Sequence, residues 1–155
     1  IMGKTLDLPL VEIKEYIYVG MGGLHKDKTP IATNGVATCM GIGTHISGIN
    51  YFSHAPPINF SDALGEYSLI YKWKKLLEKN IDNIDLIYLY TPYGICKNFL
   101  PFLVILNNLE LIDKTIYVRT TVYNEKTNNY TSEWNREFKV GINEDGPWGY
   151  DYGVR

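Results

Sequence analysis

The sequence predicts an α+β domain in which a β-sheet or β-sandwich core carries about two helices packed outside. Strand-like segments fill the first and last thirds of the chain, and the helix-like segments lie in the middle. Tyrosine is unusually common, with 13 residues against 5 phenylalanines. Tyrosine favours strands and half-buried surfaces, where one end of the ring stays in water. A chain of 155 residues is expected to form a single domain, 1–155, with a sizeable core.

The first third of the chain reads as short strands separated by turns. Residues 11–19 alternate apolar and polar side chains, as a half-buried strand does. Asn34-Gly35 predicts a turn, because this pair readily takes a positive φ. Residues 36–44 and 49–55 are apolar and β-rich, and together they predict a β-hairpin.

The rest of the chain mixes helical and strand-like patterns. Two segments have the broad apolar stripe of a helix, 62–79 and 97–109. Three segments read as strands, 85–91, 115–124 and 132–142. The aromatic, turn-rich stretch from Gly146 to Tyr150 predicts a coil pinned to the core.

Charge and hydropathy exclude several classes of partner. The formal net charge is −2, which gives no electrostatic footprint for nucleic acid. The one basic cluster, 72–75, is typical of the solvated face of an amphipathic helix. No apolar run reaches the length of a membrane span, so we expect no membrane insertion.

The cysteine and histidine content predicts free thiols and no metal. Two cysteines, Cys39 and Cys96, are too few for a disulfide-rich secreted protein, which favours a reducing, cytoplasmic location. Cys96 precedes a predicted helix and is interpreted as a structural residue. His25 and His45 lack ligand-like spacing, so neither a metal site nor a cofactor is expected.

The predicted hairpin brings Cys39 and His54 to one face. With a loop over 45–48 the two residues are directly opposite, and with a two-residue Ser47-Gly48 turn they are diagonal neighbours. A thiol beside an imidazole is the arrangement of a cysteine nucleophile, because the imidazole takes the thiol proton and the thiolate attacks a carbonyl. The alternative is a structural pair, a small core cysteine beside a satisfied histidine.

Three segments around this pair resemble a known family. They are Tyr18-Val19-Gly20-Met21-Gly22-Gly23, the stretch from Thr33 to Cys39, and Gly48 to His54. Together they are similar to the chemoreceptor glutamine deamidases, CheD, and to the wider fold of deamidase toxins related to cytotoxic necrotizing factors. The spacing of six residues between the threonine and the cysteine matches the family. The 15 residues from cysteine to histidine are slightly fewer than usual, and Ala37-Thr38 stands where the family usually has Gly-Ser.

The resemblance implies a CheD-like three-layer fold and a Cys-His-Thr thiol mechanism. Cys39 would be the nucleophile, His54 the base and later the acid, and Thr33 the residue that orients His54. The implied activity is that of a cysteine-dependent amidohydrolase, a protein-glutamine glutaminase that hydrolyses a Gln side-chain amide to Glu. The implied partner is a protein substrate with an exposed Gln, not nucleic acid.

The expected settings are chemotaxis in the cytoplasm, or a toxin or effector delivered into a host cytosol. Gly35, Gly41 and Gly43 are expected to keep the walls of the site low, so that a protein substrate can approach. Two alternatives stay open, a thiol transamidase using the same site and a non-catalytic protein-binding module of the same fold.

Overall fold

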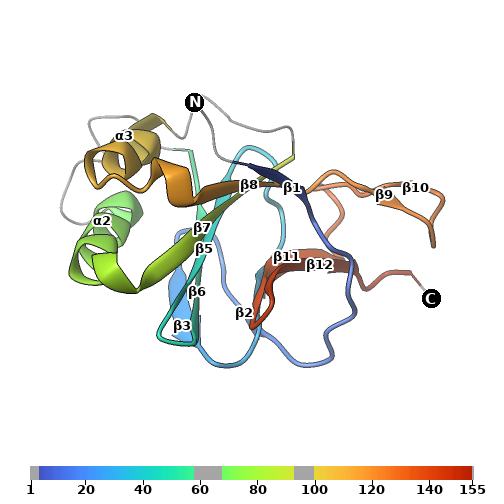
Figure 1. The fold of residues 1–155 in the computed structure, drawn as a ribbon. Helices are drawn as coiled ribbons and strands as arrows, with labels where there is room; N and C mark the ends of the chain where they lie inside the picture. Colours follow the sequence, from blue (N-terminus) through green and yellow to red (C-terminus); the bar gives the residue numbers. More distant parts are fainter. Residues whose placement is uncertain (1–3, 58–67, 93–99, 155) are drawn as a thin grey trace.

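The described part of the chain forms three layers (Figure 1). A computed structural model describes residues 4–57, 68–92 and 100–154. Helices α2 (Leu69–Lys79) and α3 (Leu100–Asn108) cover one face of a six-stranded sheet, and a four-stranded sheet covers the other face. The predicted α+β class is therefore confirmed, with a sheet sandwich at the centre and two helices outside it.

The sheets combine neighbouring and distant segments. The larger sheet has the order β1 (Thr5–Asp7), β8 (Thr115–Arg119), β7 (Ile84–Thr91), β5 (Met40–Ile46), β6 (Ile49–Ala55) and β3 (Leu24–Asp27). The smaller sheet has the order β12 (Gly146–Asp151), β11 (Phe138–Asn143), β4 (Ile31–Thr33) and β2 (Ile17–Tyr18). A ribbon of β9 (Tyr123–Asn124) and β10 (Asn129–Tyr130) extends away from both sheets (Figure 1).

The hairpin β5–β6 takes the register of a two-residue turn. Ile46 pairs with Ile49, and Gly41 pairs with His54. Ser47 and Gly48 both have positive φ, 52° and 78°, as the tight turns that match the twist of a hairpin require. Of the two hairpin registers that the sequence allowed, the one with a two-residue Ser47-Gly48 turn is thus observed.

Helix α2 is anchored to the larger sheet by a buried tryptophan. Ser68 caps the helix by accepting the backbone N–H of Tyr71 at 3.0 Å. One turn further on, the indole N–H of Trp73 donates to Ser53 Oγ of β6 at 2.7 Å. Phe102 of α3 packs edge-on against the same indole, with ring centroids 6.4 Å apart. The predicted helices 62–79 and 97–109 are observed from residue 69 and residue 100 onward, and their first residues lie outside the described ranges.

A second core fills the space between the two sheets, and Tyr90 crosses it. Tyr90 extends from β7 to donate its hydroxyl to the carbonyl of Gly141 on β11 at 2.7 Å. Its ring meets Phe52 of β6 edge-to-face at 5.1 Å. Because the Tyr90 hydroxyl is buried and satisfied, it fixes the spacing of the sheets as well as filling the core.

The C-terminal stretch is a strand, so the prediction of a coil is wrong. Residues Gly146–Asp151 pair antiparallel with β11 along its whole length. The expected attachment to the core is correct, since Trp148 is fully buried. A buried segment must pair its backbone N–H and C=O groups, and here β11 supplies the partners. The Gly and Pro residues of the stretch concealed this from the sequence pattern.

Three other predicted strands are shorter than expected. Only Ile17–Tyr18 of 11–19 is a strand, and 115–124 and 132–142 contribute β8 and β11, which lie in different sheets. The chain leaves the larger sheet at Thr120, whose N–H donates to the carbonyl of Thr91. The change of sheet requires irregular backbone, which alternation of side chains cannot reveal.

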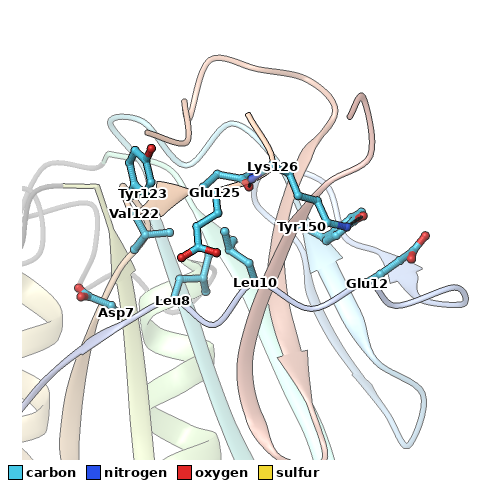
Figure 2. Close-up of a pocket in the computed structure, with 10 residues that line it drawn as sticks. Asp7, Leu8, Leu10, Glu12, Val122, Tyr123, Glu125, Lys126 and Tyr150 are labelled. Carbon is cyan, nitrogen blue, oxygen red and sulfur yellow. Dashed lines mark hydrogen bonds between the residues drawn. The ribbon is translucent and has the colours of Figure 1, made fainter. Parts of the chain in front are cut away.

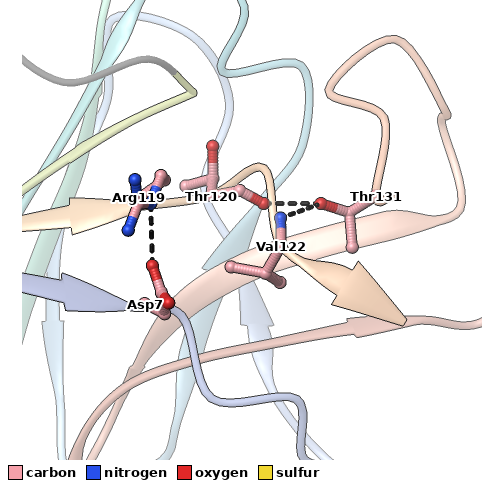
Figure 3. A network of polar contacts seen from close by, with 5 residues as sticks. All are labelled: Asp7, Arg119, Thr120, Val122 and Thr131. Atoms are coloured by element: carbon pink, nitrogen blue, oxygen red, sulfur yellow. Dashed lines mark hydrogen bonds and ion pairs between the residues drawn. The ribbon is translucent and has the colours of Figure 1, made fainter. Parts of the chain in front are cut away.

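A small polar network closes the base of the β9–β10 ribbon (Figure 3). Thr131 Oγ1 donates to the Thr120 carbonyl at 2.6 Å and accepts the N–H of Val122 at 3.0 Å. Beside it, Arg119 pairs with Asp7 at 2.7 Å, linking β8 to β1. Both charged groups are exposed, so we expect this ion pair to contribute at most about 1 kcal/mol.

Gly141 provides a direct test of the sandwich. It lies opposite Ala32, and a Cβ there would come within 1.8 Å of the Ile31 carbonyl oxygen. We expect Gly141→Ala to lower the free energy of unfolding by about 3 kcal/mol or more, since backbone cannot yield as a side chain can. Urea denaturation measures the change. Gly20→Ala, where nothing lies within 4 Å of the added Cβ, is the control, and equal stability of the two variants would contradict the packing described.

Candidate active site

The buried imidazole of His54 is held by Thr33. Thr33 ends β4 in the smaller sheet, and His54 lies near the end of β6 in the larger one. Thr33 Oγ1 is 2.7 Å from His54 Nδ1, and the exposed fractions of the two residues are 0% and 5%. Two of the three predicted site residues are therefore in direct contact, across the interface between the sheets.

Strand pairing and side-chain contacts fix the position of Thr33. Gly35 takes the positive φ expected of the Asn34-Gly35 pair, 69°, but the predicted turn is not formed at 34–36, and the chain bends at residues 37–39 instead. The Asn34 side chain accepts the hydroxyl of Tyr18 at 2.7 Å and donates to the carbonyl of Arg136 at 3.0 Å. Since Thr33 also pairs with Val140 of β11, the strand on either side of it is held and its hydroxyl has a defined direction.

The tautomer of His54 decides which ring nitrogen can act as a base. The 2.7 Å contact between Thr33 Oγ1 and His54 Nδ1 can run in either direction, because a hydroxyl both donates and accepts. When Nδ1 carries the proton and donates it to Thr33, the lone pair of the imidazole is on Nε2. This atom is buried without a hydrogen-bond partner in the part of the chain that the structure describes. The free nitrogen is thus the one that could act as a base.

The glycine-rich stretch after β2 holds the backbone of His54. The N–H of Gly22 donates to the His54 carbonyl at 2.7 Å, and the His54 N–H donates to the carbonyl of Gly23 at 3.3 Å. Gly22 adopts a φ of 87°, which a residue with a side chain rarely takes. The sequence singled out this stretch by resemblance alone, and the contact gives it a physical role.

Cys39 lies beside this arrangement under the side chain of Met21. It immediately precedes β5, two residues before Gly41, the register partner of His54. Cys39 is 6% exposed, and its sulfur contacts the Met21 sulfur at 3.9 Å. Met21 itself is 68% exposed and forms a β-bridge with His54. Cys39 and His54 therefore share Met21 as a neighbour, through its sulfur and its backbone respectively.

Burial keeps both groups neutral. It lowers the pKa of His54 below its ordinary value, because the imidazolium would be desolvated. Burial also raises the pKa of the Cys39 thiol, although a hydrogen bond with the Thr38 side chain opposes the effect. The lowered thiol pKa and partial exposure that we expect of a working nucleophile are thus absent from this covered arrangement.

The glycines of β5 have a different role from the one predicted. A Cβ at Gly41 would lie 2.9 Å from the Cβ of Tyr90, and one at Gly43 would lie 3.3 Å from the Tyr90 hydroxyl. These glycines make room for Tyr90 in the core, so they do not lower the walls of an open site. Only Gly35 of the three has open space around it.

The remaining sequence candidates do not join this site. His45 Nε2 contacts the carbonyl of Asn143 at 2.7 Å, and His25 is exposed on β3. Cys96 lies outside the described residues. Within the described ranges, no group of three or more His, Cys, Asp or Glu side chains could hold a metal ion. None of the helices there is long and apolar enough to cross a membrane.

A groove of about 580 Å³ lies away from the Cys39 site (Figure 2). Segment 7–12, the start of the β9–β10 ribbon and Tyr150 of β12 form its walls. Lys126 donates to the Tyr150 hydroxyl at 2.8 Å across one end. The lining includes the carboxylates of Asp7, Glu12 and Glu125 but neither histidine nor cysteine, so the groove lacks the groups of a thiol mechanism.

The lowered pKa of His54 predicts a specific pH dependence of stability. The unfolded chain binds a proton at this residue below pH 6.5, whereas the folded chain resists it. The contribution of His54 to the free energy of unfolding is therefore fully present above pH 6.5. It decreases as the pH is lowered toward the pKa of the folded state, by at most about 1.4 kcal/mol per pH unit. Urea unfolding of the parent chain and of His54→Gln, from pH 7.5 to 5, measures this contribution. An identical slope in both proteins would contradict it.

Comparison of the chain with models of known protein families finds no match, and comparison with curated proteins also finds none.

Proposed function

We propose that the chain is a protein glutamine deamidase, with Cys39 as nucleophile, His54 as base and acid, and Thr33 as positioning residue. One observation carries the proposal. A buried imidazole is held at Nδ1 by a buried hydroxyl, its Nε2 is unpartnered among the described residues, and Met21, the bridge partner of His54, contacts the free thiol of Cys39. A structural histidine would normally satisfy both nitrogens. The unsatisfied Nε2 suits a group whose partner is a reacting atom.

In the first half of the proposed reaction, His54 Nε2 takes the proton of the Cys39 thiol. The thiolate attacks the side-chain carbonyl carbon of a substrate glutamine, forming a C–S bond and a tetrahedral oxyanion. His54 then gives the proton to the amide nitrogen, and the C–N bond breaks to release ammonia. Backbone N–H groups near Cys39 are expected to stabilise the oxyanion. The product is a thioester between Cys39 and the glutamine side chain.

In the second half, water replaces ammonia. His54 takes a proton from the water, whose oxygen attacks the thioester carbonyl carbon. The C–S bond breaks, the proton returns to the sulfur, and the side chain leaves as glutamate. Thr33 accepts from Nδ1–H throughout. This contact keeps Nε2 directed at the reacting atoms and stabilises the positive imidazolium in each half-reaction.

Met21 accounts for the covered state of the thiol. It packs on Cys39 from the solvent side and is mostly exposed, so a substrate side chain can displace it without opening the core. In the proposed reaction, the thiol then exchanges its contact with the Met21 sulfur for one with Nε2. A covered, protonated thiol is also less open to oxidation than an exposed thiolate.

The surroundings of the site support a protein substrate. Met21 and Tyr18 are large apolar side chains left exposed next to the residues that hold His54 and Thr33. Exposed aromatic and Met side chains are enriched where proteins meet. A chemoreceptor-type or host protein in the cytosol is the proposed setting.

The other proposed function is a non-catalytic binding module. The buried Cys39 and its raised pKa favour this alternative, since an inert thiol needs no base. A transamidase would use the same acyl-enzyme with an amine in place of water. The mass of the product separates it from a deamidase.

Unfolded casein, which is rich in glutamine, serves as a test substrate. We expect ammonia release and a mass increase of about 1 Da for each glutamine converted, because oxygen replaces an NH group. Cys39→Ala should abolish the reaction, and His54→Ala should slow it roughly 100- to 10,000-fold, the usual contribution of a general base.

The Thr33 variants distinguish positioning from packing. Thr33→Ser keeps the hydroxyl and should retain most of the activity, whereas Thr33→Val keeps the shape and should lower kcat far more than it changes KM. The deamidase would be refuted if Cys39→Ala converted casein glutamines as fast as the parent chain does. It would also be refuted if neither protein converted them. Incorporation of an added amine in place of water would support the transamidase.

A further inference from the structure

A second groove, of about 560 Å³, lies on the helix side of the larger sheet. It runs between α2 and the edge strand β3. Its floor is formed by three half-buried residues at the fringe of the helix-side core, one each from β3, β6 and α2: Leu24, Tyr51 and Leu76. The floor is therefore apolar and belongs to the rigid part of the fold.

Lysines surround this floor on both walls. Lys72, Lys75 and Lys79 follow one another on α2, and Lys26 stands on β3 opposite Tyr51. All four are exposed. None makes a salt bridge within the described ranges, and no carboxylate lines the groove there. The chain carries a net charge of −2, so this groove is a positively charged site on a protein with a negative net charge.

Lys74, which lies between Lys72 and Lys75 in the sequence, shows that the unpaired lysines lie on one side of α2. Lys74 points to Glu78 at 3.1 Å and does not line the groove. Lys75 lies 5.4 Å from the Tyr71 ring centroid, a contact that leaves its charge uncompensated. The sequence interpretation of 72–75 as a solvated helix face holds, since Lys72 and Lys75 are exposed, and these two lysines also line a concavity.

Strand β3 adds a second type of binding group. It is the last strand of the larger sheet and pairs only with β6 among the described strands. An edge strand directs the N–H and C=O groups of every second residue outward, where an extended chain can pair with them. Side chains of such an added strand would reach the floor and the α2 lysines on one face.

We propose that this groove binds an acidic, extended protein segment, which adds to β3 as a strand and directs alternate carboxylates to the α2 lysines. The spacing fits. Lysines at positions 72, 75 and 79 rise about 4.5 and 6 Å along a helix, and alternate residues of a strand lie about 6.6 Å apart. The residues between the acidic ones face solvent, and the aliphatic parts of the acidic side chains pack on the floor.

The groove favours a peptide over other polyanions. Stacking of bases needs exposed aromatic faces. Tyr51 in this floor is half-buried, and His25, which also lines the groove, pairs with Phe52, whose side chain faces the smaller sheet. The lysines line a concavity rather than a flat surface, so a vesicle could not reach the floor. The chain's overall negative charge would also repel nucleic acid and anionic lipid outside the groove.

The groove is separate from the proposed active site. Along β6, Tyr51 and Ser53 face the helices, whereas Phe52 and His54 face the smaller sheet. A ligand in the groove and a substrate at Cys39 would therefore bind to opposite faces of the same sheet. The inference does not rest on deamidase activity.

The probe is a fluorescein-labelled eight-residue peptide that alternates glutamate and valine, titrated by fluorescence anisotropy at low salt. We expect saturable binding to the full chain. Lys72→Gln/Lys75→Gln/Lys79→Gln should weaken it roughly tenfold or more, since each exposed ion pair lost accounts for up to about fivefold. The matched control is Lys4→Gln/Lys14→Gln/Lys74→Gln, which removes the same charge outside the groove and should leave binding unchanged.

Further measurements test the mode of binding. Amide shifts in NMR spectra should centre on β3 and α2, and N-methylation of the peptide on its β3-facing amides should abolish binding. Equal weakening by the two triple variants, or no saturable binding by the parent chain, would overturn the proposal. So would tighter groove-dependent binding of a single-stranded oligonucleotide or of phosphatidylserine vesicles.

Discussion

The candidate site depends on one buried hydrogen bond, between Thr33 Oγ1 and His54 Nδ1. It joins the two sheets where the core between them meets the glycine-rich stretch. Loss of either partner would leave a buried polar atom unsatisfied, at a cost of about 1–3 kcal/mol. The same bond holds the imidazole so that Nε2 is the ring nitrogen left without a partner among the described residues. Packing of the sandwich and the proposed chemistry of the site therefore rest on the same contact, which the side-chain contacts of Asn34 and the pairing of β4 with β11 hold in place.

The pKa directions of His54 and Cys39 fit the resting state of the proposed reaction, before a substrate binds. Burial lowers the pKa of His54 and raises that of Cys39, so proton transfer from thiol to imidazole is unfavourable while Met21 covers the sulfur. In the proposed reaction, a substrate that displaces Met21 would change the surroundings of both groups together. The thiol would gain Nε2 as a partner, and mutual attraction and Thr33 would stabilise the ion pair that forms. Reactivity of the thiol would then depend on substrate binding.

The sequence predicted the local features better than the long-range ones. The hairpin with its two-residue register and the positive φ of Gly35 follow from the alternation of side chains and from turn residues, which act over a few positions. The strand at Gly146–Asp151 could not be predicted in this way, because it depends on β11 as a partner. Met21 over Cys39 and Tyr90 above Gly41 were missed for the same reason, since each is a contact between distant segments. The contact of Thr33 with His54 was expected only through resemblance to a family.

The most direct test of the account is the pH dependence of iodoacetamide alkylation at Cys39 with its cover removed. Peptide mass spectrometry follows the Cys39 adduct in Met21→Ala and in Met21→Ala/His54→Ala. The account predicts rapid alkylation of the first variant below pH 7, because His54 stabilises the thiolate, and loss of this reactivity in the second. Slow alkylation with an ordinary thiol pKa in both variants would contradict the dyad and leave the binding module as the function of the fold.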